Sequence, residues 1–158
     1  MTQRDPAGVN TFIERFASAF TEAGVPRMAA RTFAALLTAD SGRCTAAELA
    51  ETAQASPAAI SGAVRYLQQV GLVAREREPG TRRDVYTVHD NVWYEAMFSR
   101  EQLLQRWSAL FWTGAQALGQ DTPAGRRVAE TAEFFDFFMA EMPAMLGRWK
   151  TYREQRQA

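Results

Sequence analysis

The stretch "ASPAAISGAVRYLQQVGLVAREREPGTRRDVYTVHD", from Ala55 to Asp90, decides the fold of this chain. It begins as a helix, because Ser56 stands where an N-cap is expected and Pro57 follows at the first helical position. Apolar residues then recur at spacings of three and four as far as Gly71, the residue type that commonly ends a helix. The segments "LVARERE" and "DVYTV" predict two short strands, and "PGT" between them is a turn signal.

The residues upstream complete a recognisable motif. In "TAAELAETA", Thr45 and Glu48 have the spacing of a capping box, which predicts a helix of about two turns. "QAS" then makes a tight turn into the helix that Ser56 caps. The order is therefore short helix, tight turn, helix and hairpin, which is a helix-turn-helix followed by a wing. Two earlier helices are expected, one from Asp5 to Gly24 and one that Pro26 opens.

After Asp90 the pattern becomes helical again. One amphipathic helix is expected from Asn91 to Leu118, and a second from Thr122 to about Gln155, which Pro143 should kink or split. The sequence thus predicts a mainly α fold with a small β-hairpin wing. We expect residues 1–24 to form an N-terminal helix in a dimer interface and residues 25–90 a winged helix-turn-helix. Residues 91–158 would form long helices for dimerisation and possible effector binding.

Composition restricts the function less than the motif does. The formal net charge is zero over 158 residues, so only local clusters can argue for nucleic acid. Every basic residue except Lys150 is arginine, which favours bidentate phosphate or carboxylate contacts, although genomic base composition explains such an excess equally well. A single cysteine, no signal-peptide pattern and no apolar run of about 20 residues lead us to expect a cytoplasmic protein.

The helix that follows the tight turn has an outward face of small residues. In a helix-turn-helix the N-terminal part of this helix enters the major groove, where small side chains allow the backbone to approach DNA. Ser61 and Arg65 can reach a base edge or a phosphate, and the wing-tip arginines can contact the backbone or the minor groove. The predicted DNA contacts are Ser56, Pro57, Ala58, Ala59, Ser61, Gly62, Arg65, Arg82 and Arg83.

The charge of this region supports that prediction and leaves one alternative open. From Arg65 to Arg83, five arginines stand against two glutamates, a local charge of +3 that a dimer would double. A charged hairpin is, however, often only solvated, and winged helices also serve as protein-binding modules. A protein–protein adaptor without DNA binding therefore remains the alternative.

The residues also carry a resemblance. The stretches "GVPRMAARTFAALL", "TAAELAETAQASPAAIS", "AVRYLQQVGLV" and "PGTRRDVYTV" resemble the MarR superfamily of bacterial transcription regulators, and especially its GbsR-like branch. The resemblance implies a homodimeric winged-helix DNA binder, usually a repressor, that a small ligand can release. Two positions depart from the family pattern: Gly62 replaces a frequent arginine, and Thr81 replaces the aspartate of an Asp-Arg-Arg wing tip.

The C-terminal helices are rich in aromatic residues. Rings on more than one side of a helix indicate packing both within the domain and against a partner, for which a symmetric dimer is the commonest solution. The same rings can line a pocket for a small apolar or cationic ligand. The candidate lining residues are Trp93, Phe98, Trp107, Phe111, Phe135 and Met139.

Other chemistries find little support. Cys44 lies at the start of a helix, where a redox role is conceivable beside the ordinary reading of an inert thiol. His89 has no further ligands at metal-binding spacing. The sequence contains no nucleophile elbow, Walker loop or dinucleotide fingerprint, so we expect neither an enzyme nor a cofactor.

Overall fold

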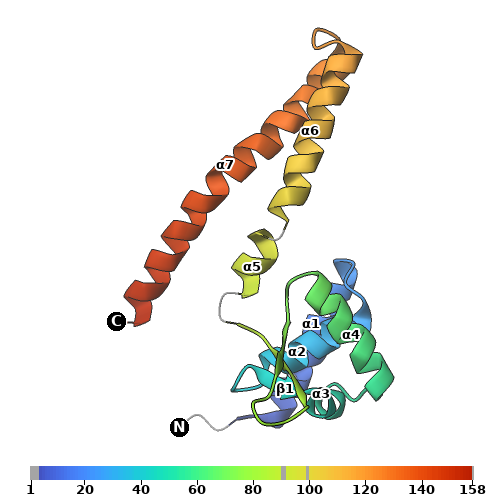
Figure 1. The fold of residues 1–158 in the computed structure, drawn as a ribbon, viewed down its shortest axis with the longest axis vertical. Coiled ribbons are helices and arrows are strands. Elements are labelled where there is room, and N and C mark those ends of the chain that lie inside the picture. The colour runs from blue at the N-terminus through green and yellow to red at the C-terminus, as the bar shows by residue number, and fades with distance from the viewer. Residues whose placement is uncertain (1–3, 90–91, 99, 158) are drawn as a thin grey trace. The chain divides into compact units, whose positions relative to one another are not determined.

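The computed structural model describes residues 4–89, 92–98 and 100–157. The chain divides into two compact units, residues 1–96 and 97–158, whereas the sequence pattern predicted a division after Asp90. The elements in chain order (Figure 1) are α1 (Pro6–Glu22), α2 (Arg27–Leu37), β1 (Arg43–Thr45), α3 (Ala46–Thr52), α4 (Pro57–Gln69), β2 (Ala74–Arg77), β3 (Asp84–Thr87), α5 (Val92–Phe98), α6 (Glu101–Leu118) and α7 (Pro123–Gln157). The predicted mainly α fold with a small β wing is confirmed.

Local capping fixes the helix-turn-helix of the first unit. Thr45 and Glu48 form the predicted capping box of α3, and the hydroxyl of Ser56 accepts the amide of Ala59 at 3.2 Å to start α4. Gly71 adopts a φ of 75°, a left-handed conformation that glycine enters without steric cost, and so ends α4 as expected.

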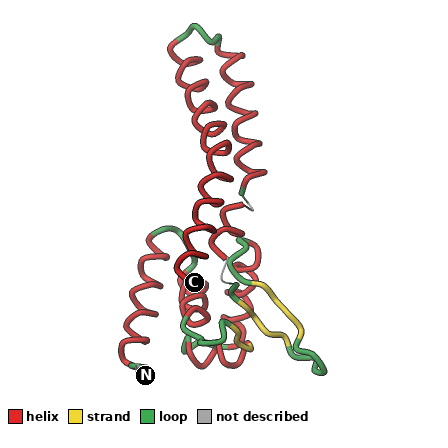
Figure 2. The backbone as a smooth tube through the Cα atoms, turned by 90° about the vertical axis from the view of Figure 1, so that its left-hand side faces the viewer, coloured by secondary structure: helices red, strands yellow, loops and turns green. Residues whose placement is uncertain are grey.

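The sheet has one strand more than the sequence predicted. β2 and β3 form the expected antiparallel hairpin, and the short β1 pairs with the other edge of β3 in the order β1-β3-β2. Cys44 stands opposite Tyr86, which links the residues before α3 to the base of the hairpin. Figure 2 shows the hairpin extending away from the helices that carry it. We call β2, β3 and the connecting residues 78–83 the wing.

A continuous apolar core holds α2, α3 and α4 together. Its largest fully buried apolar side chains are Phe33, Leu36, Leu49, Ile60 and Leu67. Burying one such side chain contributes roughly 1.5–3 kcal/mol relative to leaving it exposed. The apolar face of α4 is therefore committed to the core, so its opposite face is left for contacts with other molecules.

The second unit is a helical hairpin in which α6 and α7 lie side by side (Figures 1 and 2). The connection demands a glycine at position 125, because a Cβ there would stand 2.0 Å from the carbonyl oxygen of Gly119. One prediction needs correction, because the expected helix over 91–118 consists of α5 and α6. Of the kink or split expected at Pro143, the split does not occur, since α7 continues through this residue.

Hydrogen bonds and rings join the two helices of this hairpin. Asp136 of α7 accepts hydrogen bonds from the hydroxyl of Ser108 and, at 2.8 Å, from the indole N–H of Trp112. These bonds, led by that from Ser108, hold the pKa of the Asp136 carboxyl below its usual value. Phe135 stacks on Phe111 with ring centroids 5.8 Å apart, so polar and apolar contacts fix the same stretch of the hairpin.

Candidate nucleic-acid interface

The outward face of α4 is almost free of bulk. Ile60, Ala63, Val64 and Leu67 point into the core, while the opposite side presents exposed residues, namely Ser56, Pro57, Ala58, Ser61, Gly62 and Arg65. Ala59, also a predicted contact, is only half-buried, and its amide is already bonded to Ser56. A Cβ built on Gly62 meets nothing within 4 Å, so the fold of the chain does not require glycine there.

The N-terminal end of α4 is also suited to an anion. The helix dipole makes this end partially positive. Pro57 has no N–H, and the amides of Ala59 and Ile60 are bonded to Ser56, so the Ala58 amide is the one that remains for an anion among the first residues of α4. A phosphate group can therefore be met by the Ala58 N–H and by the exposed Ser56 hydroxyl at the same place.

The five arginines of this region fall into two groups. Arg75 donates to Asp84 at 2.6 Å across the hairpin, and this contact lowers the pKa of the Asp84 carboxyl. The other four, Arg65, Arg77, Arg82 and Arg83, are exposed, and their guanidinium groups form no ion pair within the described ranges. Four guanidinium groups without an ion pair in the described ranges therefore lie on α4 and the wing, although Arg77 lies close enough to Asp84, and Arg83 to Glu48, to lower the pKa of these carboxyls further.

Arg77 is the residue that the predicted set of contacts omitted. The period of two in β2 places Arg75 and Arg77 on the same exposed face, and Arg77 stands opposite Asp84 in the strand register. The carboxylate nevertheless bonds the diagonal neighbour, Arg75. The alternation of "ARER" placed both arginines on one face, but only the structure shows that Asp84 bonds Arg75 and acts on Arg77 through charge alone.

Thr81 bonds the backbone of the wing tip, as the side chain of an aspartate at this position could. Its hydroxyl accepts the amide of Arg83 at 3.2 Å and lies 3.3 Å from the carboxylate of Glu78. This local turn fixes the backbone between the two exposed arginines of the tip. The guanidinium groups themselves receive no orienting carboxylate from position 81.

Cys44 and His89 are the two further residues whose surroundings bear on redox or metal chemistry. Cys44 is buried, and desolvation, followed by the nearby Glu48, raises the pKa of its thiol, which opposes the lowering expected from a helix N-terminus. His89 is exposed at the base of the wing. The described residues contain no group of three or more His, Cys, Asp or Glu side chains that could hold a metal ion.

The predicted ligand residues do not converge on one place. Trp93 packs against Phe20 and Phe33 in the first unit and borders a hollow of about 310 Å³ beside His89. In the second unit Phe135 contacts both Trp107 and Phe111, so these rings fill the space between α6 and α7. Met139 is half-buried, and the side chain of Phe98 lies outside the described residues.

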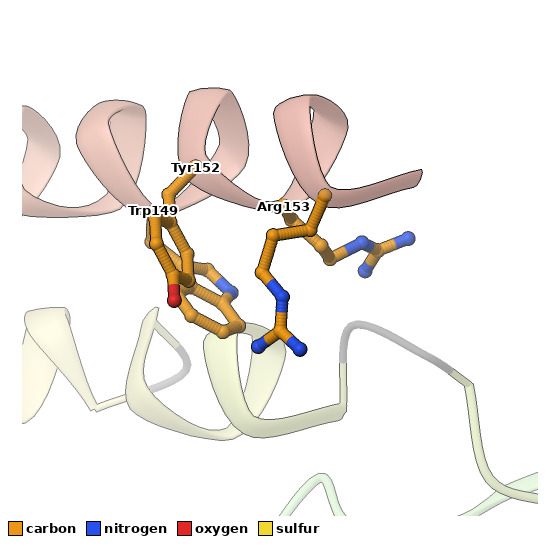
Figure 3. Close-up of a pocket in the computed structure, with 4 residues that line it drawn as sticks. Trp149, Tyr152 and Arg153 are labelled. Carbon is orange, nitrogen blue, oxygen red and sulfur yellow. The ribbon is translucent and has the colours of Figure 1, made fainter. Parts of the chain in front are cut away.

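A further hollow lies on the last turns of α7. It measures about 240 Å³ and is lined by Trp149, Tyr152, Arg153 and Arg156. Trp149 and Tyr152 extend to the same side of the helix (Figure 3), with ring centroids 5.7 Å apart, and the Arg156 guanidinium lies 5.9 Å from the Tyr152 ring. Two guanidinium groups at this hollow are unfavourable for a cationic ligand.

No described helix is both long enough and apolar enough to cross a bilayer.

Two family models match the chain, one for the MarR family over residues 23–84 and one for MmpR5-like MarR family transcriptional regulators over residues 91–154. The HTH-type transcriptional regulator MmpR5 of Mycobacterium tuberculosis (strain ATCC 25618 / H37Rv) is 28% identical over 139 residues, which cover 87% of this chain and 84% of that protein.

One solved structure supports the family matches. A crystal structure of a transcriptional regulator superposes with a TM-score of 0.79 at 27% identity, covering 91% of this chain and 99% of the other. The MarR family regulator Sco3205 from Streptomyces coelicolor, solved in complex with DNA, gives a TM-score of 0.42 at 18% identity, covering 96% and 86%. The winged helix-turn-helix, the two family matches and the 0.79 superposition lead to one assignment: the chain belongs to the MarR family of winged-helix transcriptional regulators.

Proposed function

We propose that the protein binds double-stranded DNA as a homodimer on a pseudo-palindromic operator and acts as a repressor in the cytoplasm. The observation that carries this proposal is the pairing of two features in one compact unit. The exposed half of α4 is built from small residues, and the arginines that flank it on α4 and the wing are exposed and, apart from Arg75, form no ion pair with a described residue.

Each part of this surface has a role in the proposed complex. The N-terminal half of α4 lies in the major groove, where the absence of bulk at Ala58, Ser61 and Gly62 lets the helix backbone approach the base edges. Ser56 and the amide of Ala58 hold a phosphate. Arg65 contacts a guanine or a phosphate, and the exposed wing arginines contact the backbone or the adjacent minor groove.

Dimerisation is supported by apolar side chains that the single chain leaves in water. On α6 and α7 these include Leu110, Phe134 and Phe137, which are 69%, 60% and 66% exposed, and on α1 Phe12 is 45% exposed. Isolated exposed apolar residues are ordinary, but several large ones on two helices that lie side by side, as on α6 and α7, mark an interaction surface. A two-fold dimer buries them, and a pseudo-palindromic operator offers the α4 helices of the two copies half-sites about one DNA turn apart.

The effector is a separate part of the proposal. The ring cluster of Trp107, Phe111 and Phe135, with Met139 on the same helix as Phe135, supports a small apolar ligand that displaces one of these rings. A cationic ligand receives less support at the C-terminal hollow because of its arginines. Assignment to the GbsR-like branch stays a prediction, and the match over residues 91–154 points to MmpR5-like regulators instead.

The first experiment titrates the purified protein into labelled DNA from upstream of its own gene, over a range of salt, against scrambled DNA of equal length. We expect tight binding to the native fragment, with an affinity that falls steeply as salt rises because phosphate contacts release counterions. Absence of any binding at low salt would favour the protein–protein adaptor. The exposed faces of α6 and α7 would then be the surface on which to seek a protein partner.

A further inference from the structure

One arginine of the first unit contacts two other helical segments at once. Arg31 of α2 donates from Nε and Nη2 to the carbonyl oxygen of Ala53, at 3.3 and 3.1 Å. Its Nη1 donates to Oε1 of Glu14 on α1, at 2.5 Å. A single guanidinium group therefore joins α1 and α2 to the turn between α3 and α4.

The carbonyl of Ala53 is one that the helix itself cannot satisfy. The end of α3 is closed by two backbone bonds, from Gln54 N to Glu51 O at 3.2 Å and from Ala55 N to Ala50 O at 2.9 Å. This is the Schellman pattern, with Gln54 in the left-handed conformation at a φ of 51°. The pattern leaves the Ala53 oxygen without a backbone donor from this turn, and Arg31 supplies two side-chain donors instead.

The position of this carbonyl matters for the recognition helix. Ala53 precedes Ser56, the N-cap of α4, by three residues, and Gln54 is the only non-glycine residue with positive φ within the described ranges. The turn thus holds an uncommon backbone conformation directly before the proposed DNA-reading end of α4. A guanidinium group that fixes one side of the turn restricts the direction in which α4 begins.

Arg31 is not placed to contact DNA itself. Its side chain is only 14% exposed, and three of its N–H groups are engaged within the protein. The arginines of the wing tip, by contrast, are exposed and make no ion pair with any described residue. The partner of Arg31 on α1, Glu14, lies on the same helix as Phe12, whose exposed ring we assign to the dimer surface.

We propose that Arg31 is a positioning residue that couples α1 to the helix-turn-helix turn and thereby sets the orientation of α4 for DNA. The inference deepens the proposed function and rests on it for the effect on DNA. Because α1 belongs to the proposed dimer surface, a displacement of α1 reaches the turn through the Glu14–Arg31–Ala53 contacts. The fork shape of the guanidinium suits this role, since three separate N–H groups of one rigid plane bond the two acceptors, an arrangement that an ammonium group reproduces only in part.

The experiment measures amide hydrogen exchange and DNA affinity in the full chain. The variants are Arg31→Met, which removes both contacts, Arg31→Lys, which keeps the charge, and Glu14→Gln, which removes only the ion pair. Arg27→Met is the matched control, because Arg27 is exposed on the same helix, four residues away, and makes no ion pair within the described ranges. Ile13→Val is a second control that lowers stability in the core of α1 without touching Arg31.

We expect Arg31→Met to speed exchange in peptides that span residues 50–60, while exchange in α6 and α7 stays unchanged. DNA affinity should fall about tenfold at constant salt, the scale of removing one hydrogen bond to a charged group. The salt dependence should keep its slope, because the number of neutralised phosphates stays the same. Arg31→Lys should recover part of the affinity, and neither control should change the exchange of residues 50–60.

Two results would overturn the proposal. Unchanged exchange at residues 50–60 in Arg31→Met would show that the guanidinium does not hold the turn. A smaller salt slope in the same variant would show that Arg31 contacts phosphate directly. If the wild-type chain binds no DNA, the proposed function fails, whereas the exchange measurement still decides whether Arg31 holds the turn.

Discussion

The arginines of the wing differ in whether their guanidinium groups are free of an ion pair and so available to DNA phosphates. Arg82 and Arg83 are exposed without an ion-pair partner in the described part of the chain, whereas Arg75 is bonded to Asp84 at 2.6 Å. The double variant Arg82→Ala, Arg83→Ala should weaken DNA binding and lower the salt slope by about 0.9 for each phosphate that the protein no longer neutralises. The measurement is a fluorescence anisotropy titration at several salt concentrations.

Arg75→Met is the internal control for that experiment. It removes an arginine from the same hairpin, but one whose charge Asp84 already offsets, so its salt slope should remain close to that of the wild type. Equal slopes for the wild type and the double variant would mean that the wing tip does not touch the phosphates. The assignment of the wing as a DNA contact would then be wrong.

Gly62 allows stability and DNA affinity to be separated at a single residue. Its position in α4 is exposed, and an added Cβ meets nothing within 4 Å, so Gly62→Ala should stabilise the fold by about 0.5–1 kcal/mol. The same methyl group lies on the face that approaches DNA, so affinity should fall. Urea denaturation and the DNA titration test the two signs, and a variant with both higher stability and unchanged affinity would exclude a close approach at Gly62.

Among the elements, the α6–α7 hairpin contains a titratable link between its helices. Asp136 accepts hydrogen bonds from Ser108 and Trp112, which lower the pKa of its carboxyl. A carboxyl with a lower pKa in the folded state stabilises the fold above its unfolded pKa of about 3.9 and loses that contribution as pH falls through the folded value. Asp136→Asn should therefore be less stable than the wild type at pH 7, by a margin that shrinks below about pH 4.

Denaturation curves followed by tryptophan fluorescence at about pH 7, 5 and 3.5 test this dependence. Asp121→Asn is the control, because Asp121 is exposed in the connection between α6 and α7 and its side chain makes no hydrogen bond among the described residues. A difference between Asp136→Asn and the wild type that does not vary with pH would show that the charge of the carboxylate is unimportant. The contact of Asp136 with Ser108 and Trp112 would then contribute through packing and neutral hydrogen bonds alone.

The elements that the sequence predicted are those with local capping signals. Thr45 with Glu48, Ser56 with Pro57, and Gly71 each satisfy backbone groups within a few residues, so the pattern alone places the helix ends. β1 was missed because a three-residue strand exists only through its pairing with β3, which lies about 40 residues later. The break between α5 and α6 was missed because residues 92–101 contain neither proline nor glycine.

The candidate DNA-binding site also contains features that the sequence predicted and features that only the structure shows. The outward face of α4 follows from a period of 3.6 residues, and its exposed small side chains were predicted from sequence. Whether an arginine is paired depends on contacts across the hairpin. The pattern therefore did not show that Asp84 bonds Arg75, or that Arg77 belongs with the exposed arginines that form no ion pair. The link from Arg31 to Ala53 spans 22 residues and joins a side chain to a backbone carbonyl, which no periodicity encodes.

For the molecule as a whole, the proposed function requires two copies. The strongest test removes exposed rings from α7, where Phe134 and Phe137 are 60% and 66% exposed. Phe134→Glu, Phe137→Glu should convert the dimer to a monomer, because it places two charges in a surface that dimerisation would bury. Mass determination by sedimentation equilibrium over a range of concentrations measures the change.

The control variant matches the change in charge without removing a ring. Arg127→Gln, Arg148→Gln also lowers the net charge by two on α7, at exposed residues, and should remain dimeric. The monomeric variant should bind a DNA fragment with two half-sites no more tightly than one with a single half-site, because the gain from linking two sites is lost. A dimer of unchanged strength in the phenylalanine variant would place the interface elsewhere, and a wild-type chain that stays monomeric would contradict the two-fold operator complex.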